Sequence, residues 1–169
     1  MFNGELAVRL SGAVSKVADF GNPVKTFAYQ LNQGGPLQFA NGTLDYQADL
    51  YWSDQILIAS SGSQSLDLAG SLFDDLGVAC NFAKIRGILV SSADANAHDL
   101  IIGNGTNPFL GPFGAAAHTA AVKPGGVFAA FAPRTGWPVT AATADILKLA
   151  NAGAVSGITV DVHILGTSA

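Results

Sequence analysis

The sequence predicts an all-β fold: an antiparallel β-sandwich or jelly roll of about ten short strands with little helix. Three observations lead to this prediction. In most segments large apolar residues alternate with polar ones at a period of two, as they do on the two faces of a strand. Glycine, proline, asparagine and serine separate these segments at short intervals. Nowhere along the chain is a helix favoured over a strand.

The clearest turn signal in the sequence is a chain reversal at 123–126. Lys123-Pro124-Gly125-Gly126 separates two apolar runs, 119–122 and 127–132. Proline fixes φ near −65° and glycine accepts a positive φ, so these four residues suit a tight turn. We therefore predict a β-hairpin whose second arm is uncharged and buried on one face or both.

Before this reversal the alternation predicts strands over 5–10, 24–31, 43–52, 55–59, 66–72, 78–91 and 97–104. A helix over 6–17 is the alternative for the first of them, since it would align Leu6, Leu10, Val14 and Val17, although Gly12 weakens it. Ser53 and Asp54 are read as a turn. Residues 72–77 are read as a short 3₁₀ or α turn.

Glycine and proline modify two of the remaining segments. Gly87 predicts a bulge or a bend inside 78–91. Residues 107–114 contain two prolines and two phenylalanines that look exposed, which indicates a loop or an edge segment. Strands are expected again over 137–140, 144–150 and 158–165.

The chain is poor in charge. Of its 169 residues 12% are charged, against about 25% in an average soluble protein. Much of the folded surface must then be apolar or neutral, and such surfaces are usually covered by a partner. The net charge of −4 and the missing Lys/Arg cluster argue against nucleic acid as that partner.

The N-terminus and the single cysteine limit the cellular setting. The N-terminus lacks a basic region followed by a long apolar run, so no secretory signal is expected, and no apolar run is long enough to span a membrane. Cys80 is the only cysteine, so no intramolecular disulfide is possible, and its apolar neighbours predict a buried thiol. We expect one domain, with residues 1–36 as N-terminal strands or a docking arm and 37–169 as the sandwich core.

Candidate chemistry is sparse. His163 beside Asp161 could act as a base with an orienting carboxylate, but two solvated strand residues explain the pair better. The oxygen-rich segment 94–99 resembles the start of a calcium loop without its glycine and closing glutamate, so a polar turn is favoured. The sequence predicts no catalytic residue, no metal site and no cofactor.

Aromatic residues provide the candidate contacts. Tyr51, Trp52 and Trp137 could stack on sugar rings, although core or interface packing is favoured. The predicted assembly contacts are Phe2, Trp52, Phe109, Phe113 and Trp137.

Several segments resemble a family of small structural proteins encoded by tailed bacteriophages. They are 65–72, 82–86, 122–128, 139–140 with 145–147, and 161–169. The resemblance implies a non-enzymatic virion component, a capsid decoration or cement protein. Such a protein would be made in the host cytoplasm and placed on the capsid exterior, with itself (as a dimer or trimer) and the major capsid protein as partners. The alternative is a carbohydrate- or receptor-binding module of a phage tail or spike.

Overall fold

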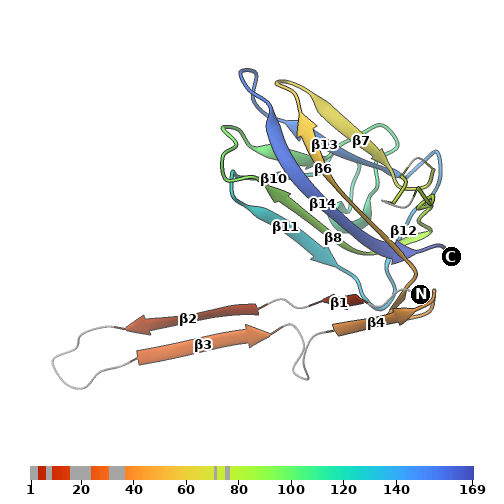
Figure 1. The fold of residues 1–169 in the computed structure, drawn as a ribbon, viewed down its shortest axis with the longest axis horizontal. Helices are drawn as coiled ribbons and strands as arrows, with labels where there is room; N and C mark the ends of the chain where they lie inside the picture. The colour runs from red at the N-terminus through yellow and green to blue at the C-terminus, as the bar shows by residue number, and fades with distance from the viewer. Residues whose placement is uncertain (1–3, 7–8, 16–23, 31–36, 71, 75–76) are drawn as a thin grey trace.

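The computed structural model describes the chain apart from residues 1–3, 7–8, 16–23, 31–36, 71 and 75–76 (Figure 1). Nearly all regular structure in the described part is β-strand, and the single helical element there is the 3₁₀ turn η1, Gly111–Phe113. The predicted all-β class is confirmed.

Two antiparallel sheets form the body of the protein (Figure 1). One has the strand order β10-β9-β13-β7, and the other has the order β11-β8-β14-β6, with β12 also paired to β8. The first sheet consists of β7 (Ser63–Asp67), β9 (Leu100–Gly103), β10 (Thr119–Val122) and β13 (Ile146–Asn151). The second consists of β6 (Leu50–Ile58), β8 (Lys84–Ser92), β11 (Val127–Phe131), β12 (Trp137–Pro138) and β14 (Ile158–Thr167).

The inward faces of the two sheets make one apolar core. Along β13 and β14 every second residue is buried, so the period of two in the sequence becomes the boundary between core and surface. Leu147 and Leu149 of one sheet and Val160 and Val162 of the other have no exposed area. Each such side chain contributes about 1.5 to 3 kcal/mol relative to its exposure to water.

The reversal at 123–126 is a turn, but its two arms do not form a hairpin. β10 pairs with β9 in one sheet, whereas β11 pairs with β8 in the other. The N–H of Gly126 donates to the carbonyl of Lys123 at 2.8 Å and Gly125 has a φ of 72°, as at the third position of a type II turn. The hairpin prediction is wrong because turn chemistry fixes a reversal and leaves the partner of each arm open.

The predicted turn at Ser53 and Asp54 is also wrong. β6 continues through both residues and pairs with β14 along its whole length, with Ser53 opposite His163 and Asp54 opposite Val162. The ten-residue partner strand β14 pairs with β6 on both sides of these two residues, and this long-range pairing overrides the local preference for a turn. The strand predicted over 43–52 is correspondingly shorter, since only β5 (Gln47–Ala48) precedes β6 there.

Of the two alternatives predicted at Gly87, a bulge or a bend, the structure has a bulge. Leu165 lies opposite Gly87 and the next residue of β14, Gly166, lies opposite Ile85, so Arg86 is the extra residue of β8. Glycine is required beside it, because a Cβ at Gly87 would lie 2.8 Å from the ring of Phe131. The long strand predicted from residue 78 is regular only from Lys84 onward.

A small sheet attaches the N-terminal part of the chain to the sandwich. It contains β1 (Gly4–Leu6), β4 (Leu37–Asn41) and β5 in the order β1-β4-β5, and its β4–β5 pair is parallel. Phe39 and Ala48 of this sheet are buried and pack with Phe131 and Leu165 of the sandwich.

Two further N-terminal strands lie apart from the sandwich. β2 (Arg9–Ser15) and β3 (Val24–Gln30) pair with each other as a two-stranded antiparallel sheet, here called the ribbon (Figure 1). The helical alternative over 6–17 is wrong, because 9–15 is strand. The boundary proposed at residue 36 stays a prediction.

Candidate partner-binding groove

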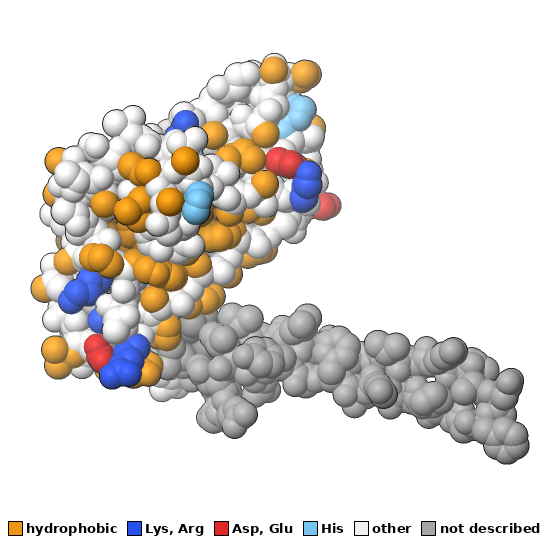
Figure 2. Space-filling view, turned by 180° about the vertical axis from the view of Figure 1, so that it is seen from behind, with side chains coloured by type: hydrophobic (Ala, Val, Ile, Leu, Met, Phe, Trp, Pro, Cys, Tyr) orange, Lys and Arg blue, Asp and Glu red, His pale blue; other side chains and the backbone are white. Residues whose placement is uncertain are grey.

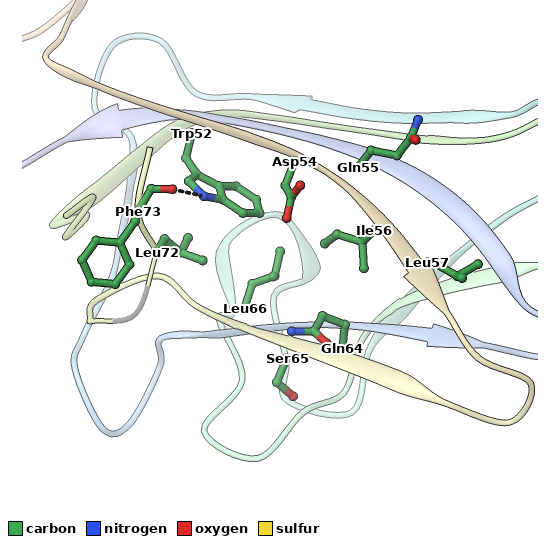
Figure 3. A pocket seen from close by; sticks show the side chains of 10 residues that line it. All are labelled: Trp52, Asp54, Gln55, Ile56, Leu57, Gln64, Ser65, Leu66, Leu72 and Phe73. Atoms are coloured by element: carbon green, nitrogen blue, oxygen red, sulfur yellow. Dashed lines mark hydrogen bonds between the residues drawn. The ribbon is translucent and has the colours of Figure 1, made fainter. Parts of the chain in front are cut away.

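The two sheets leave a groove between β6 and β7, here called the β6–β7 groove. Within the described residues each of these strands is the outermost of its sheet on this side of the sandwich. The groove has a volume of about 540 Å³ and opens to solvent. The residues that line it are Trp52, Asp54, Gln55, Ile56, Leu57, Gln64, Ser65, Leu66, Leu72 and Phe73 (Figure 3).

The groove has a mixed lining in which the polar accessible surface exceeds the apolar surface, and Asp54 is its one charged side chain. Asp54 and Ile56 of β6 and Leu66 of β7 point into the space between the two strands (Figure 3). Leu66 is buried and Ile56 is half-buried, whereas Asp54 is exposed. Asp54 makes no hydrogen bond or ion pair with any of the described residues. The groove therefore combines aliphatic side chains with neutral polar groups and one carboxylate that has no partner among the described residues.

One end of the groove is closed by the chain itself. The indole N–H of Trp52 donates to the carbonyl of Phe73 at 3.1 Å, and the Cys80 thiol contacts the carbonyl of Tyr51 with Sγ 3.7 Å from the oxygen. These contacts cover the beginning of β6. The outer edge of β6 over 53–58 has no strand beside it in the described part of the chain.

A second hollow of about 490 Å³ lies on the other side of β7. Its lining is polar apart from one isoleucine, and consists of Ser63, Ser65, Thr106, Asn107, Ile146 and Lys148. Its only charged side chain is Lys148. The β6–β7 groove is the stronger candidate for a binding site, because it is larger and has two aromatic residues, Trp52 and Phe73, in its lining.

The predicted assembly residues lie in different environments. Trp52 and Phe109 belong to the core, with 5% and 2% of their surface exposed, so the folded chain offers neither as a broad contact surface, and Phe109 is not exposed as the sequence indicated. Phe113 is half-buried and stacks on Phe128 with ring centroids 5.7 Å apart. Trp137 is half-buried against the core. Phe2 lies outside the described residues.

The aromatic residues considered for sugar stacking are not brought together as one platform. Trp52 is buried, Trp137 is half-buried in β12, and Tyr51 is 44% exposed on the outer face of β6. The Tyr51 hydroxyl lies 2.7 Å from Nδ1 of His163, and the two rings stack. Only Tyr51 of the three therefore presents much of its ring to solvent.

The candidate acid–base pair on β14 is engaged with other residues. His163 contacts Tyr51, whereas Asp161 accepts a hydrogen bond from Nε2 of Gln55 at 2.8 Å and a longer one from the Ser91 hydroxyl at 3.5 Å. No hydrogen bond joins His163 to Asp161 in the described structure. The arrangement is that of a solvated strand face, as the sequence favoured.

The oxygen-rich segment 94–99 uses its polar groups to fix the loop between β8 and β9. Asn96 bonds to the backbone of Thr159, and Asp99 forms an ion pair with Lys123 at 2.6 Å. Over the residues that the structure describes, no three His, Cys, Asp or Glu side chains gather as potential metal ligands. The favoured interpretation as a polar turn agrees with these contacts.

The sequence reading missed Arg86. This arginine is 1% exposed at the bulge of β8, and its guanidinium donates to the carbonyls of Arg134, Thr43 and Leu44. Burial lowers the pKa of Arg86, and the charge of nearby Asp45 opposes that shift. The one feature of the sequence that could have indicated this buried arginine is its position inside an apolar strand and next to Gly87.

Cys80 is buried, as predicted. Burial raises the pKa of its thiol, the charge of Asp74 adds to this, and a backbone hydrogen bond opposes it. A raised pKa disfavours the thiolate that a nucleophile needs.

No helix in the described part of the chain has the length and apolar character to cross a membrane.

Charged side chains are few on the surface as well. On the face seen in Figure 2, hydrophobic side chains are spread among neutral polar ones, and most of the charged groups lie toward the margins. Leu57 and Val127, on the outer face of the β11-β8-β14-β6 sheet, are 75% and 58% exposed.

No model of a known protein family matches the chain, and a search of curated proteins finds no match.

Proposed function

We propose that the protein is a non-enzymatic structural component of a bacteriophage virion, a capsid decoration or cement protein on the capsid exterior. It associates with itself and with the major capsid protein. The resemblance of several segments to phage structural proteins motivates the phage assignment. The observation that carries the assembly role is the ribbon, a two-stranded sheet set apart from the sandwich.

An isolated two-stranded sheet is marginally stable in water, and a third strand or a packed apolar face is normally needed. The ribbon therefore gains most of its stability from a surface outside its own two strands. The low charge of the whole chain supports the same role, because interfaces are depleted of charged residues at their centre. On a symmetric shell many weak contacts of this kind add up through avidity.

Purified virions provide the direct test of location. Quantitative proteomics should find the protein at a copy number comparable with that of the major capsid protein. Absence from virions, or a few copies per particle, would contradict the decoration role. A tail or spike module that binds sugar would instead appear at low copy number and bind a glycan array in a manner that Trp137→Ala abolishes.

Removal of the arm tests how the protein attaches. A variant that lacks residues 1–36 should lose binding to capsids while its sandwich still unfolds cooperatively, because the core of the two sheets lies entirely after residue 36. Binding that equals that of the full chain would show that the arm is not the attachment element.

A further inference from the structure

The β6–β7 groove has polar residues at positions that face the interior of the sandwich. Asp54 of β6 lies opposite Val162 of β14. Gln64 of β7 lies opposite Leu149 of β13. Both partners have no exposed area, and side chains opposite each other in an antiparallel pair lie on the same face of the sheet. Asp54 and Gln64 are nevertheless exposed, so solvent reaches this part of the interior face.

These two side chains have unused hydrogen-bonding groups. Neither Asp54 nor Gln64 makes a side-chain hydrogen bond or an ion pair with any residue that the structure describes. An ionised carboxylate accepts hydrogen bonds at two oxygens, and a glutamine amide both donates and accepts. Ile56 and Leu66 lie in the same lining. The groove therefore offers acceptors and a donor next to aliphatic side chains.

The size and polarity of the groove restrict the class of ligand. Its volume of about 540 Å³ lies within the roughly 300 to 1,000 Å³ of small-molecule sites, and because it opens to solvent a longer chain can extend beyond it. No lysine or arginine lines it, which argues against phosphate and other anions. Its polar surface exceeds its apolar surface, which argues against a lipid or an apolar peptide.

A neutral sugar has the complementary chemistry. The hydroxyls of a pyranose ring donate and accept hydrogen bonds, as Asp54 and Gln64 require. A hydroxyl that donates to a carboxylate makes a charge-assisted hydrogen bond, roughly twice as strong as a neutral one. The C–H groups of the ring form an apolar face that suits the aliphatic part of the lining.

We propose that the β6–β7 groove binds a segment of a neutral glycan. The carboxylate of Asp54 and the amide of Gln64 form hydrogen bonds with sugar hydroxyls. Ile56 and Leu66 contact the C–H face of a ring. Phe73, which lines the same groove and is 60% exposed, is available for stacking on an adjacent sugar.

The inference goes beyond the proposed function and does not rest on it. A single groove is expected to bind weakly, because water competes for exposed hydrogen-bonding groups. Many copies of the protein on a symmetric shell would present many grooves at once. Their contacts with a glycan-coated surface would then add up through avidity.

Titration of the full-length protein with neutral oligosaccharides tests the proposal. The probes are tetrasaccharides of glucose, galactose, mannose and N-acetylglucosamine, measured by isothermal titration calorimetry up to millimolar concentrations. At least one of them should bind saturably. Asp54→Asn and Gln64→Leu should each raise its dissociation constant about tenfold, because each variant loses hydrogen bonds to sugar hydroxyls.

Two further variants serve as controls. Asp94→Asn removes an exposed carboxylate that lies beside Gly125 and outside the lining of the groove. Trp137→Ala removes the other aromatic candidate for sugar stacking, which also lies outside the groove. Both should leave the dissociation constant unchanged. Binding that Trp137→Ala abolishes and Asp54→Asn does not affect would place the sugar elsewhere and overturn the proposal.

Nuclear magnetic resonance on the unmodified chain provides a second measurement that needs no variant to fold. The amide signals of 53–58 and 63–67 should shift together as the bound tetrasaccharide is added. Shifts confined to other strands overturn the proposal, and so does the absence of binding to every probe. A tetralysine peptide that binds through Asp54 while no sugar does would show that the groove takes a cation instead.

The two proposals fail separately. A protein that is abundant in virions but binds none of the sugars would leave the decoration role standing and overturn the glycan site. A protein that binds a sugar through Asp54 and Gln64 but is absent from virions would do the opposite.

Discussion

The side chain of Asn96 exchanges two hydrogen bonds with the backbone of Thr159. Nδ2 of Asn96 donates to the Thr159 carbonyl, the Thr159 N–H donates to Oδ1 of Asn96, and both distances are 2.8 Å. The amide thus occupies the place of a neighbouring strand at the start of β14. It ties the loop after β8 to the central strand of the sheet.

Replacement of Asn96 should therefore destabilise the sandwich. Asn96→Ala leaves the Thr159 N–H without this partner, while the Thr159 carbonyl keeps the N–H of Ala93, and the loss is about 1 to 3 kcal/mol. Asn96→Asp keeps the acceptor but sets a carboxylate oxygen against the Thr159 carbonyl, so we expect it to be destabilised as well. Urea unfolding measures both values. The exposed Asn81→Ala should change the free energy of unfolding by less than about 0.5 kcal/mol, and an equal loss at both sites would contradict the role given to Asn96.

Arg86 holds two loops against the bulge of β8. Arg86→Lys keeps the charge but cannot reach three carbonyls with one ammonium group, and we expect a loss of about 2 to 4 kcal/mol in the free energy of unfolding. Arg134→Lys is the control, because its ion pair with Asp45 is exposed on both sides and contributes little. If the two variants unfold at the same denaturant concentration, the carbonyl contacts of Arg86 are not important for stability.

Substitutions at Gly125 test the turn at 123–126, which connects β10 in one sheet to β11 in the other. Its φ of 72° lies in the left-handed region, where asparagine is tolerated better than alanine and a β-branched residue worst. Thermal unfolding should rank the variants Gly125→Asn, Gly125→Ala and Gly125→Val in that order of increasing loss, with about 1 kcal/mol for alanine.

Part of that loss comes from a contact and not from the backbone. A Cβ at Gly125 would lie 2.8 Å from Oδ1 of Asp94. In an Asp94→Ala background the cost of Gly125→Ala should shrink while the order of the three variants stays the same. A valine variant as stable as the asparagine variant would show that the turn does not hold this conformation.

We expect the buried thiol of Cys80 to lower the free energy of unfolding in alkaline solution. Its thiol has a raised pKa in the folded chain because of burial, whereas in the unfolded chain it ionises around pH 8.5. Below that pH both states carry the proton and this group adds no pH dependence. Above it the unfolded state binds fewer protons than the folded state, so the free energy of unfolding falls as the pH rises.

The Cys80→Ala variant removes this contribution. Between neutral pH and about pH 10 it should lose less stability than the unmodified chain, while tyrosine and lysine residues affect both proteins alike. Denaturant unfolding at matched pH values measures the difference. Parallel curves for the two proteins would mean that the thiol does not titrate differently in the two states.

The sequence by itself determined the class of fold, the position of the reversal at 123–126, an irregularity at Gly87 and the burial of Cys80. Each of these depends on residues next to one another: alternation fixes which face of a strand is apolar, and glycine or proline fixes where the backbone can turn. The same local signals favoured a strand over a helix for most segments, and the structure agrees.

Only the tertiary structure decided which strands pair. In the structure β10 and β11 belong to different sheets, β6 continues through Ser53 and Asp54, and Trp52 and Phe109 are buried in the core. It also put Arg86 among carbonyls from distant loops and left the β6–β7 groove between two edges far from any single motif. A period of two in the sequence specifies which face of a strand is apolar but does not specify which strand pairs with it. Strand pairing is set by backbone hydrogen bonds between residues distant in the chain.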